Sequence, residues 1–575
     1  MGNNLNIYLA SDNIISSLGF STKENLEAIY SLHSGILSDN SSDISDTPIL
    51  SARIDTKRLD TAIQKYGIEQ YNKTEQLAIL SIKELLSNQN IDITSSDCGL
   101  IISTTKGNVD LLRNHTDEIN KDAYLWKTAS NISSHFGIDK NNIKVISNAC
   151  ISGVSALIVA QRLLRKGVYK HIIVVGVDAL SHFITSGFLS FKSVSEHICK
   201  PYDAERDGLS LGEACGSILL TTEHTPDAVT LRGGAISNDA NHISGPSRTG
   251  DGLHFAIEGA MNDADIAVDD IDFVNLHGTA TVYNDEMESK AIYSSNLQSK
   301  PINSLKSYFG HTLGASGIIE TIVSAHSLKE KIVFGIPTFE KNGTSQPLNI
   351  SNSHRNIPDI KTCIKTASGF GGCNAAIVLS LNPSEKDKTA DDITIEHKSC
   401  SIGNNTIKIN DDVVFSSNAE DFATFIREAY KNLEESNQKF YKMDNLSKLG
   451  YIAASYLLKN TDINTTKTGI ILANSASSLD TDTKFQRIID ENGDEGASPS
   501  VFVYTLANIV AGEICIRHKI QGDNTFFISQ EEDLLFLQDY TKLALENTDM
   551  QHCIYGWCEF LNNKYKAEFR LIDKI

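Results

Sequence analysis

The sequence predicts an α/β fold, in which apolar strands alternate with helices and form buried sheets. Through about the first 380 residues, short β-rich runs alternate with segments of helical period. The runs are almost continuously apolar, which is typical of strands that are covered on both faces. At 575 residues, the chain is long enough for two to four domains with sizeable cores.

The predicted elements follow one another in a regular order. Short runs rich in valine, isoleucine and leucine predict strands at 98–104, 143–147, 171–179, 216–221 and 271–278. Amphipathic stretches between them predict helices, most clearly at 74–88 and 153–167. This alternation indicates sheets layered against helices.

A polar, charged stretch with few apolar residues, "NPSEKDKTADD" at 382–392, interrupts the pattern. We interpret residues 383–392 as a linker. It would follow a first domain, 1–382, with halves at about 1–225 and 226–382. A further segment, 393–575, lies beyond it.

The C-terminal segment repeats part of the first domain. Residues 447–482 run parallel to 73–110, and 504–529 run parallel to 127–147, which indicates an internal duplication. Laying "TFFISQEEDLL" over "IKVISNACISG" puts Glu532 where Cys150 stands, so the copy has no thiol at that point. The copy also ends before any second half. The segment is therefore predicted to be a degenerate, non-catalytic half-domain.

Half of a pseudo-symmetric pair should leave an apolar face uncovered, which is costly in water. We therefore expect this segment to dock on the first domain, on a second copy or on a separate chain. The alternative is an unrelated α/β domain on a flexible linker.

Composition excludes some classes of protein. The formal charge of −21 argues against nucleic acid or an anionic membrane as the main partner. The ten cysteines form no CxxC pair and are sparse for a disulfide scaffold, which indicates a reducing compartment. No apolar run approaches the roughly 18–20 residues that span a bilayer. The start of the chain lacks the pattern of a secretory signal, so we expect a cytoplasmic protein without a membrane span.

Cys150 lies in "VISNACISGVSAL", between a predicted strand and a predicted helix. As one of ten cysteines it could simply be a small core residue. At a strand-to-helix turn, however, unpaired N–H groups and the positive end of the helix dipole favour a thiolate. Ser152 and Gly153 permit a tight turn. The position therefore predicts a nucleophile for a thioester or another acyl group.

Two histidines and a glycine-rich turn strengthen this hypothesis. His277 and His311 lie among glycine and threonine at a predicted strand end and a predicted helix start, where α/β folds build active sites. Either histidine alone would more often be structural. The glycines in 368–380 precede a predicted strand rather than a helix, unlike a dinucleotide fingerprint. They would let backbone N–H groups approach an anionic oxygen.

Five segments occur in an order that resembles the β-ketoacyl synthases: "SNACISG", "CKPYDAERDGLSLGEACG", "HGTATVYND", "KSYFGHTLGASG" and "GFGGCNAA". The resemblance is to the elongating, decarboxylating branch and covers about residues 5–382. It implies a thiolase-like fold of two pseudo-equivalent α/β halves in a layered sheet-and-helix sandwich, with a thiolase-like half-domain added at the C-terminus. Members of this family usually assemble as dimers.

The resemblance also implies roles for individual residues. Cys150 would accept the acyl group, and His277 and His311 would be the catalytic histidines. Lys306 would support the site electrostatically, and Glu320 and Asp285 would organise it. Thr279 and Thr281 would contact the phosphopantetheine arm. Phe370 would gate the site and share an oxyanion hole with Cys150.

The implied reaction is a decarboxylating Claisen condensation. An acyl group moves from a carrier-protein thioester to Cys150, with oxyanion donors stabilising the tetrahedral charge. A malonyl thioester then loses carbon dioxide, and its enolate attacks the acyl-enzyme to give a 3-oxoacyl thioester. No metal or bound cofactor is implied, because the substrates are carried on the phosphopantetheine of an acyl carrier protein. The implied partners are that carrier and a second subunit, identical or of the synthase-like chain-length type.

Other hypotheses stay open at this point. Lys106 lies near a position where many relatives have an apolar residue in the acyl pocket, which leaves the size and polarity of the acyl group open. Cys373 could be a second thiol, as in a non-decarboxylating thiolase acting on coenzyme A esters, although we interpret it as structural. A scaffold or chain-length subunit is a third reading, which the intact Cys150 argues against. The pathway could be fatty acid, polyketide or aryl-polyene/flexirubin-type elongation, and "STTKGN" resembles the last of these.

Overall fold

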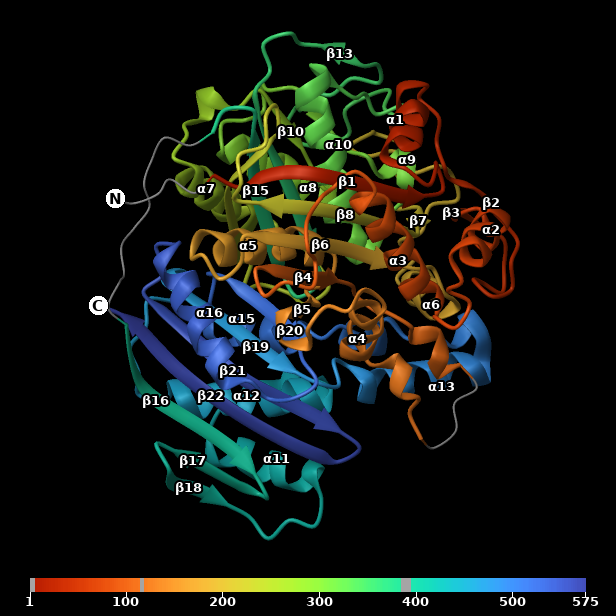
Figure 1. Cartoon of the computed structure of the whole chain (residues 1–575). Helices are drawn as coiled ribbons and strands as arrows, with labels where there is room; N and C mark the ends of the chain where they lie inside the picture. The colour runs from red at the N-terminus through yellow and green to blue at the C-terminus, as the bar shows by residue number, and fades with distance from the viewer. Residues whose placement is uncertain (1–5, 114–117, 384–393) are drawn as a thin grey trace.

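The computed structural model describes residues 6–113, 118–383 and 394–575 (Figure 1). The predicted linker therefore falls almost wholly outside the described residues. The predicted strands form with nearly the expected bounds, except that β10 (Phe273–Asn275) is short. The chain leaves the sheet after Asn275, which carries His277 away from the strand.

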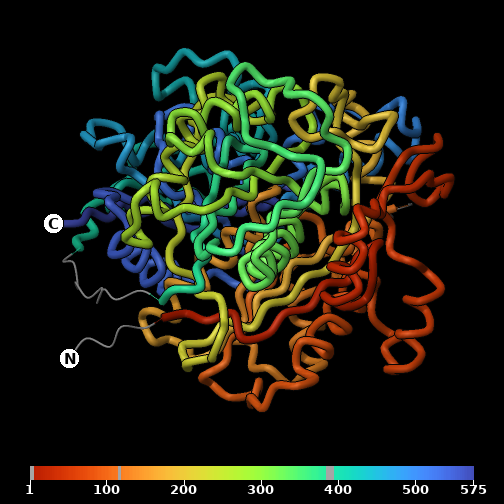
Figure 2. The backbone as a smooth tube through the Cα atoms, turned by 90° about the horizontal axis from the view of Figure 1, so that it is seen from above, coloured from red at the N-terminus to blue at the C-terminus, as the bar shows by residue number. Residues whose placement is uncertain are grey.

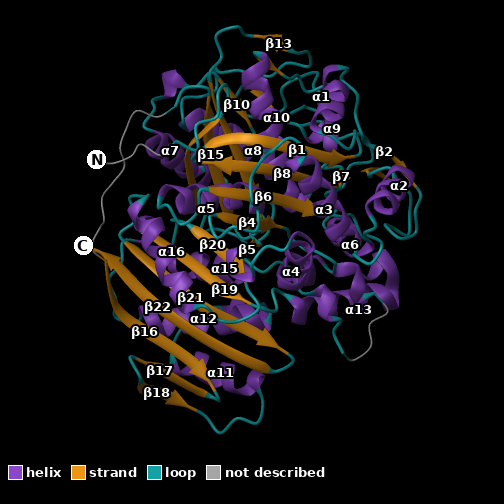
Figure 3. Ribbon diagram, viewed as in Figure 1, coloured by secondary structure: helices purple, strands orange, loops and turns teal. Residues whose placement is uncertain are grey.

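One long sheet runs through the middle of the molecule (Figures 1 and 3). Its N-terminal part contains the order β1, β8, β6, β4, β5, with the last three strands parallel. These strands are β1 (Tyr8–Ser16), β8 (Ala214–Thr221), β6 (His171–Asp178), β4 (Cys98–Ser103) and β5 (Ile143–Ile146).

The C-terminal segment continues this sheet with the same order in reverse, β20, β19, β21, β22, β16. Its strands are β20 (Asn524–Ile528), β19 (Thr468–Asn474), β21 (His552–Leu561), β22 (Lys564–Lys574) and β16 (Thr394–Gly403). Two short strands, β17 (Thr406–Ile409) and β18 (Asp412–Ser416), extend the edge beyond β16.

The two parts meet where β5 pairs antiparallel with β20. Phe527 pairs with Ile146, and Ile528 pairs with Val145. In the overlay predicted from sequence, Phe527 corresponds to Val145 and Ile528 to Ile146. The register is therefore symmetric about a pseudo-two-fold axis between the two strands, and the C-terminal segment docks on the first domain.

The helices repeat in the same way. α3 (Lys73–Leu86) packs on β8, β1 and β6, while α12 (Asn445–Leu458) packs on the equivalent strands β22, β16 and β21. α5 (Ser152–Arg165) corresponds to α16 (Leu534–Glu546). The predicted α/β class and the repeated half are confirmed, whereas the domain boundaries stay a prediction.

A buried ion pair also joins the two parts. Arg162 of α5 donates to Asp523 Oδ2 (2.6 Å) and to the Tyr540 hydroxyl (2.9 Å). Both charged side chains are almost fully buried. Removing one partner of such a pair leaves an uncompensated buried charge, at a cost of about 3–5 kcal/mol. The pair therefore specifies this one docked arrangement.

Among the described residues, a second layer of strands is seen in the first domain, joined to the long sheet where Tyr8 of β1 pairs with Thr230. In it, β9 (Thr230–Asn238), β15 (Cys373–Ser380) and β14 (Thr362–Gly369) are antiparallel, and β10 and β11 (Ile302–Asn303) complete it. α5 and α10 (Ser316–Glu330) pack together between the two layers. Figures 1 and 2 place the start of β1 and the end of β22 on the same side of the molecule.

The helices of the described residues were compared with the length and hydropathy of a membrane span. Among these residues, no single helix is long and apolar enough to cross a membrane. One pair, Pro499–Thr505 and Ile509–His518, meets that test only together and is bent by 102°.

Candidate active site

Cys150 lies in the turn from β5 to α5. The residue before it, Ala149, has a φ of 48°, an uncommon conformation for a residue other than glycine. The Ser152 hydroxyl accepts from the Asn148 N–H (2.8 Å) and donates to the Ala149 carbonyl (2.6 Å). The Asn148 side chain donates to the Asn524 carbonyl of β20 (2.7 Å), so the C-terminal half helps to fix this turn.

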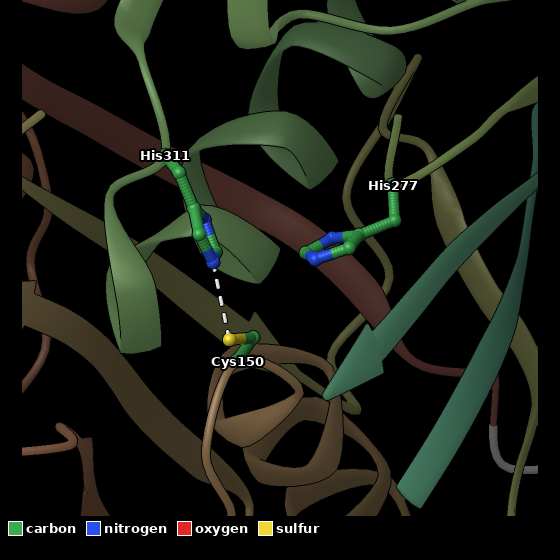
Figure 4. A group of neighbouring side chains, drawn as sticks. All are labelled: Cys150, His277 and His311. Carbon is green, nitrogen blue, oxygen red and sulfur yellow. Dashed lines mark hydrogen bonds between the residues drawn. The ribbon is translucent and has the colours of Figure 1, made fainter. Parts of the chain in front are cut away.

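The two predicted histidines face Cys150 (Figure 4). His311 Nε2 lies 3.1 Å from Cys150 Sγ, and the rings of His277 and His311 are nearly perpendicular with centroids 5.2 Å apart. The sulfur and one nitrogen of each ring lie within 4.8 Å of one another. The buried Nδ1 of His277 has no hydrogen-bond partner.

Burial decides the protonation states of this group. It raises the pKa of the Cys150 thiol to about 12, although the charge of Lys306 and the backbone N–H groups of Cys150 and Phe370 act in the other direction. Burial therefore opposes the thiolate that the turn was expected to stabilise, because only 9% of Cys150 is exposed. Burial and the charge of Lys306 hold the pKa of His277 and His311 well below the ordinary value, so both imidazoles are neutral at pH 7.

Lys306 belongs to a buried charge cluster. Its ammonium group contacts Glu320, a pairing that was not predicted, and Lys365 Nζ lies 2.6 Å from the other oxygen of Glu320. All three are almost fully buried. Sequence analysis missed Lys365, although a lysine inside the apolar run of β14 was a signal for it.

A pair of acidic side chains holds the His277 loop. Asp285, which the sequence implied, accepts from the Tyr202 N–H (2.7 Å) and the Ala280 N–H (3.2 Å). Glu288, which sequence analysis missed, accepts from the His277 N–H (2.9 Å) and from Gly278. Burial and the charge of Glu288 raise the pKa of Asp285 to about 7. Glu288 lies one helical turn beyond Asp285, which is the spacing that could have identified it.

Thr279 and Thr281 lie side by side, and Phe370, the predicted gate, lies among other phenylalanines. The hydroxyls of Thr279 and Thr281 are 2.9 Å apart, and Thr279 is buried while Thr281 is half-buried. The ring of Phe370 lies 6.2 Å from Phe188 and 5.5 Å from Phe191, centroid to centroid. These phenylalanines form an apolar wall beside the nucleophile.

The C-terminal half also contacts Phe370, the predicted gate. The Asn508 side chain donates to the Phe370 carbonyl (2.9 Å) and lies 3.6 Å from Cys373 Sγ. A side chain at Gly371 would meet Asn508, with its Cβ only 2.7 Å from the amide nitrogen, and the φ of Gly371 is 91°. Glycine is therefore required at this point of contact.

A small pocket extends from Cys150 toward the C-terminal half. Its volume is about 20 Å³, and Phe370, Phe188, Phe502 and Leu506 are among its lining residues. Since one water needs roughly 10–15 Å³, an acyl chain fits only if the aromatic wall moves. Phe502 and Leu506 come from the C-terminal half, so both parts of the chain form this pocket.

Lys106, which lies near a position where many relatives have an apolar residue, also lines this pocket. Its ammonium group lies 2.8 Å from Asp482 of the C-terminal half, and both side chains are buried. Its loop is held by Asp178, which accepts from the backbone N–H groups of Lys106 (3.2 Å) and Gly314 (2.7 Å). Sequence analysis missed Asp178 and Asp482, since each acts through a partner far away in the chain.

The layered halves and the buried cysteine with two neutral imidazoles define an acyl-transferring condensing enzyme of the thiolase-like class. Two family models match the chain, "Beta-ketoacyl synthase, N-terminal domain" over residues 38–225 and "Beta-ketoacyl synthase, C-terminal domain" over 228–340. Together they cover more than half of it, and the chain belongs to the β-ketoacyl synthase family. It is an acyltransferase for condensation in fatty acid or polyketide elongation.

Named relatives agree with this family. The chain is 27% identical over 419 residues to 3-oxoacyl-[acyl-carrier-protein] synthase 2 of Staphylococcus aureus (strain MRSA252), covering 66% of this chain and 99% of the relative. It is 25% identical over 352 residues to a putative polyketide beta-ketoacyl synthase 1 of Streptomyces halstedii, covering 54% and 83%.

Solved structures confirm the thiolase-like fold class. The PfaC keto synthase-chain length factor has a TM-score of 0.77 at 14% identity and covers 99% of this chain and 78% of its own. The ketosynthase ApeO in complex with its chain length factor ApeC, from Xenorhabdus doucetiae, has a TM-score of 0.58 at 24% identity, covering 66% and 98%. The first likeness includes the C-terminal half of this chain.

Proposed function

We propose that this chain catalyses a decarboxylating condensation in which Cys150 carries the growing acyl group. The observation that supports it most is the group of three buried atoms, Cys150 Sγ and one nitrogen each of His277 and His311, within 4.8 Å of one another. A thioester carbonyl oxygen placed between the two rings would receive N–H donors where negative charge develops.

In the first half-reaction, Cys150 Sγ attacks the carbonyl carbon of an acyl thioester. The thiol proton passes to the departing phosphopantetheine thiolate, directly or by way of the neighbouring His311 Nε2. The backbone N–H groups of Cys150 and Phe370 act on the sulfur side of this site and would stabilise the tetrahedral oxyanion. The raised pKa of the thiol makes this proton transfer part of the acylation step.

In the second half-reaction, a malonyl thioester loses carbon dioxide, and the electrons of the broken carbon–carbon bond form an enolate. Neutral His277 and His311 would hold the enolate oxygen through N–H donors. The enolate carbon then attacks the acyl carbonyl on Cys150 and releases the thiolate. The Lys306–Glu320–Lys365 cluster would favour the negative charge that develops near it.

We propose that an acyl carrier protein delivers both substrates, with Thr279 and Thr281 facing the phosphopantetheine arm. Their adjacent hydroxyls offer donors and acceptors to its amides. The chain would carry its own dimer partner in the C-terminal half, because β20 occupies the edge of β5. Names of several structural neighbours include a chain length factor, which supports a related role for residues 393–575.

The pocket supports a restriction on the acyl group. Phe502 and Leu506 close it on the side of the C-terminal half, and the buried Lys106–Asp482 pair lies beside it. A long apolar chain would have to pass this pair or displace it, at the cost of desolvated charge. We therefore expect short acyl groups to be preferred over long apolar ones.

The test is to incubate the full-length protein with an acyl-carrier thioester and a malonyl-carrier thioester. We expect release of carbon dioxide, a 3-oxoacyl product and an acyl adduct on Cys150 by mass spectrometry. Cys150→Ala should lose both adduct and product, whereas Cys373→Ala, which removes the other thiol near the site, should keep most activity. Condensation of two acyl coenzyme A esters without carbon dioxide release would instead identify a thiolase.

A further inference from the structure

A second cluster of potential metal ligands lies away from Cys150, at the junction of three segments. It contains Asp46 from the loop before β3 (Ile49–Ala52), His182 at the start of α6 (His182–Ser190), and Asp494 near the end of α13 (Leu479–Gly496). Asp494 belongs to the C-terminal half. The three side chains therefore meet across the contact between the two parts of the chain.

The distances between these ligand atoms suit a metal ion. His182 Nε2 lies 3.4 Å from Asp46 Oδ1 and 3.2 Å from Asp494 Oδ1. Two tetrahedral ligands at zinc–ligand distances of about 2.0–2.1 Å lie roughly 3.3–3.4 Å apart. A single ion could therefore bind all three atoms without large movements.

His182 provides an independent reason to expect a ligand. Only 5% of the residue is exposed, and its Nε2 is a buried nitrogen without a hydrogen bond, although two carboxylates lie close to it. Buried polar atoms of this kind are uncommon. The nitrogen points to a group that completes the site.

The carboxylates are held in place as metal ligands usually are. Asp46 Oδ2 accepts from the Asp494 N–H (2.8 Å), and Asp494 Oδ2 accepts from the Asp46 N–H (2.8 Å) and the Ser45 hydroxyl (3.0 Å). Gly493, with a φ of 63°, permits this exchange, since a Cβ there would lie 2.6 Å from Asp46 Oδ2. These bonds fix the carboxylates and leave Asp46 Oδ1 directed toward His182.

We propose that Asp46, His182 and Asp494 bind a divalent transition-metal ion that fastens the C-terminal half to the first domain. A mixed imidazole and carboxylate set suits Zn²⁺, with water as a fourth ligand. The side chain of Asp46 is half exposed, which gives the ion a path from solvent. The carboxylates of Asp494 and Asp46 raise the pKa of His182, so binding of the ion would displace a proton from this imidazole.

The test measures Zn²⁺ uptake by equilibrium dialysis of the chelator-treated, full-length protein. Because Cys150, His277 and His311 could also hold a metal ion, the measurement is made in a Cys150→Ala background. We expect about one tightly bound Zn²⁺ per chain and a rise in Tm on binding. Adding Asp46→Asn should weaken binding by at least about 100-fold and remove the rise.

Asp43→Asn is the matched control, since Asp43 lies in the same loop, is mostly exposed and pairs with Arg53 instead. It should leave Zn²⁺ binding unchanged. If His182→Gln does not fold, the Asp46→Asn comparison still decides the matter. The proposal is overturned if the Cys150→Ala protein binds no Zn²⁺, which would make the cluster an ion pair only, or if Asp46→Asn binds it equally well.

Discussion

The turns at the ends of β5 and β20 occupy equivalent places in two copies of one half-fold, yet they present different side chains. The first turn presents Cys150, and α5 behind it is buried along almost its whole length. The second has Glu532 at the corresponding position, paired with Lys566. Within α16, Leu535 is 69% exposed and Asp539 is exposed as well.

The difference follows from what covers each helix. Gly153 of α5 packs so closely on α10 that an added Cβ would lie 2.9 Å from the Ile318 backbone nitrogen. Its counterpart in α16 is Leu535, which is exposed and is not covered by another layer of the described residues. The expectation of an uncovered apolar face is thus only partly correct, because charged side chains such as Asp539 and Lys542 accompany Leu535 on this helix.

The C-terminal copy has kept the features that face the first domain. β20 pairs with β5, Asn508 donates to the Phe370 carbonyl, and Phe502 and Leu506 line the pocket beside Cys150. At its own turn it has Glu532 in place of a thiol. The copy therefore contributes side chains to the surroundings of Cys150.

The largest effect is expected from removing the copy. A chain that ends at residue 383 should lose condensing activity and aggregate, because β5 becomes an exposed edge and the pocket loses Phe502 and Leu506. Activity and light scattering measure this.

Aggregation alone would explain a loss of condensing activity in the shortened chain. The second experiment therefore uses Asn508→Ala in the full-length protein. It should fold normally but reduce activity, because the carbonyl of the Phe370 gate loses its donor. A fully active, monodisperse chain ending at 383 would contradict the assigned role of the C-terminal half.

Within the catalytic copy, His277→Ala and His311→Ala should each slow malonyl decarboxylation by about 10²–10³-fold, the usual effect of losing one oxyanion donor. Acylation of Cys150 should still occur in both variants, and intact-mass measurement of the adduct separates the two steps. Decarboxylation at the parent rate in either variant would remove that histidine from the mechanism.

The contact between the copies can be tested at its buried ion pair. Lys106→Met leaves Asp482 without a partner and should lower the free energy of unfolding by about 3–5 kcal/mol. The double variant with Asp482→Leu should recover most of this stability and accept longer acyl chains, measured by denaturant unfolding and by a chain-length series. An unchanged chain-length preference would place the pair outside the acyl path.

A thiol at the β5 turn and a thiol introduced at the β20 turn should differ in pKa. Because burial raises the pKa of Cys150 to about 12, its thiolate fraction and its alkylation rate should rise about tenfold per pH unit from pH 7 to 9. The thiol introduced by Glu532→Cys in a Cys150→Ala background is partly exposed and should level off near an ordinary thiol pKa of about 8.5. A plateau for Cys150 below pH 8 would show that a thiolate forms in the free protein.

Much of the site could be predicted from the sequence because its residues lie in short local patterns. Cys150 follows an apolar strand and precedes a small-residue helix start, and His277 and His311 lie beside glycines that shape their loops. The order of strands and helices also repeats along the chain, which made the second half-fold visible. Such local signals depend on neighbours within a few residues.

Tertiary structure alone decided the rest, since those contacts join residues far apart in the chain. Asp482 reaches Lys106 across 376 positions, and Lys365 of strand β14 reaches Glu320 of helix α10. The protonation state of the Cys150 thiol also depends on tertiary structure, because its burial depends on how the strands and the C-terminal half pack around it. The sequence determined which groups can react, and packing determined their charge, their partners and which copy became the enzyme.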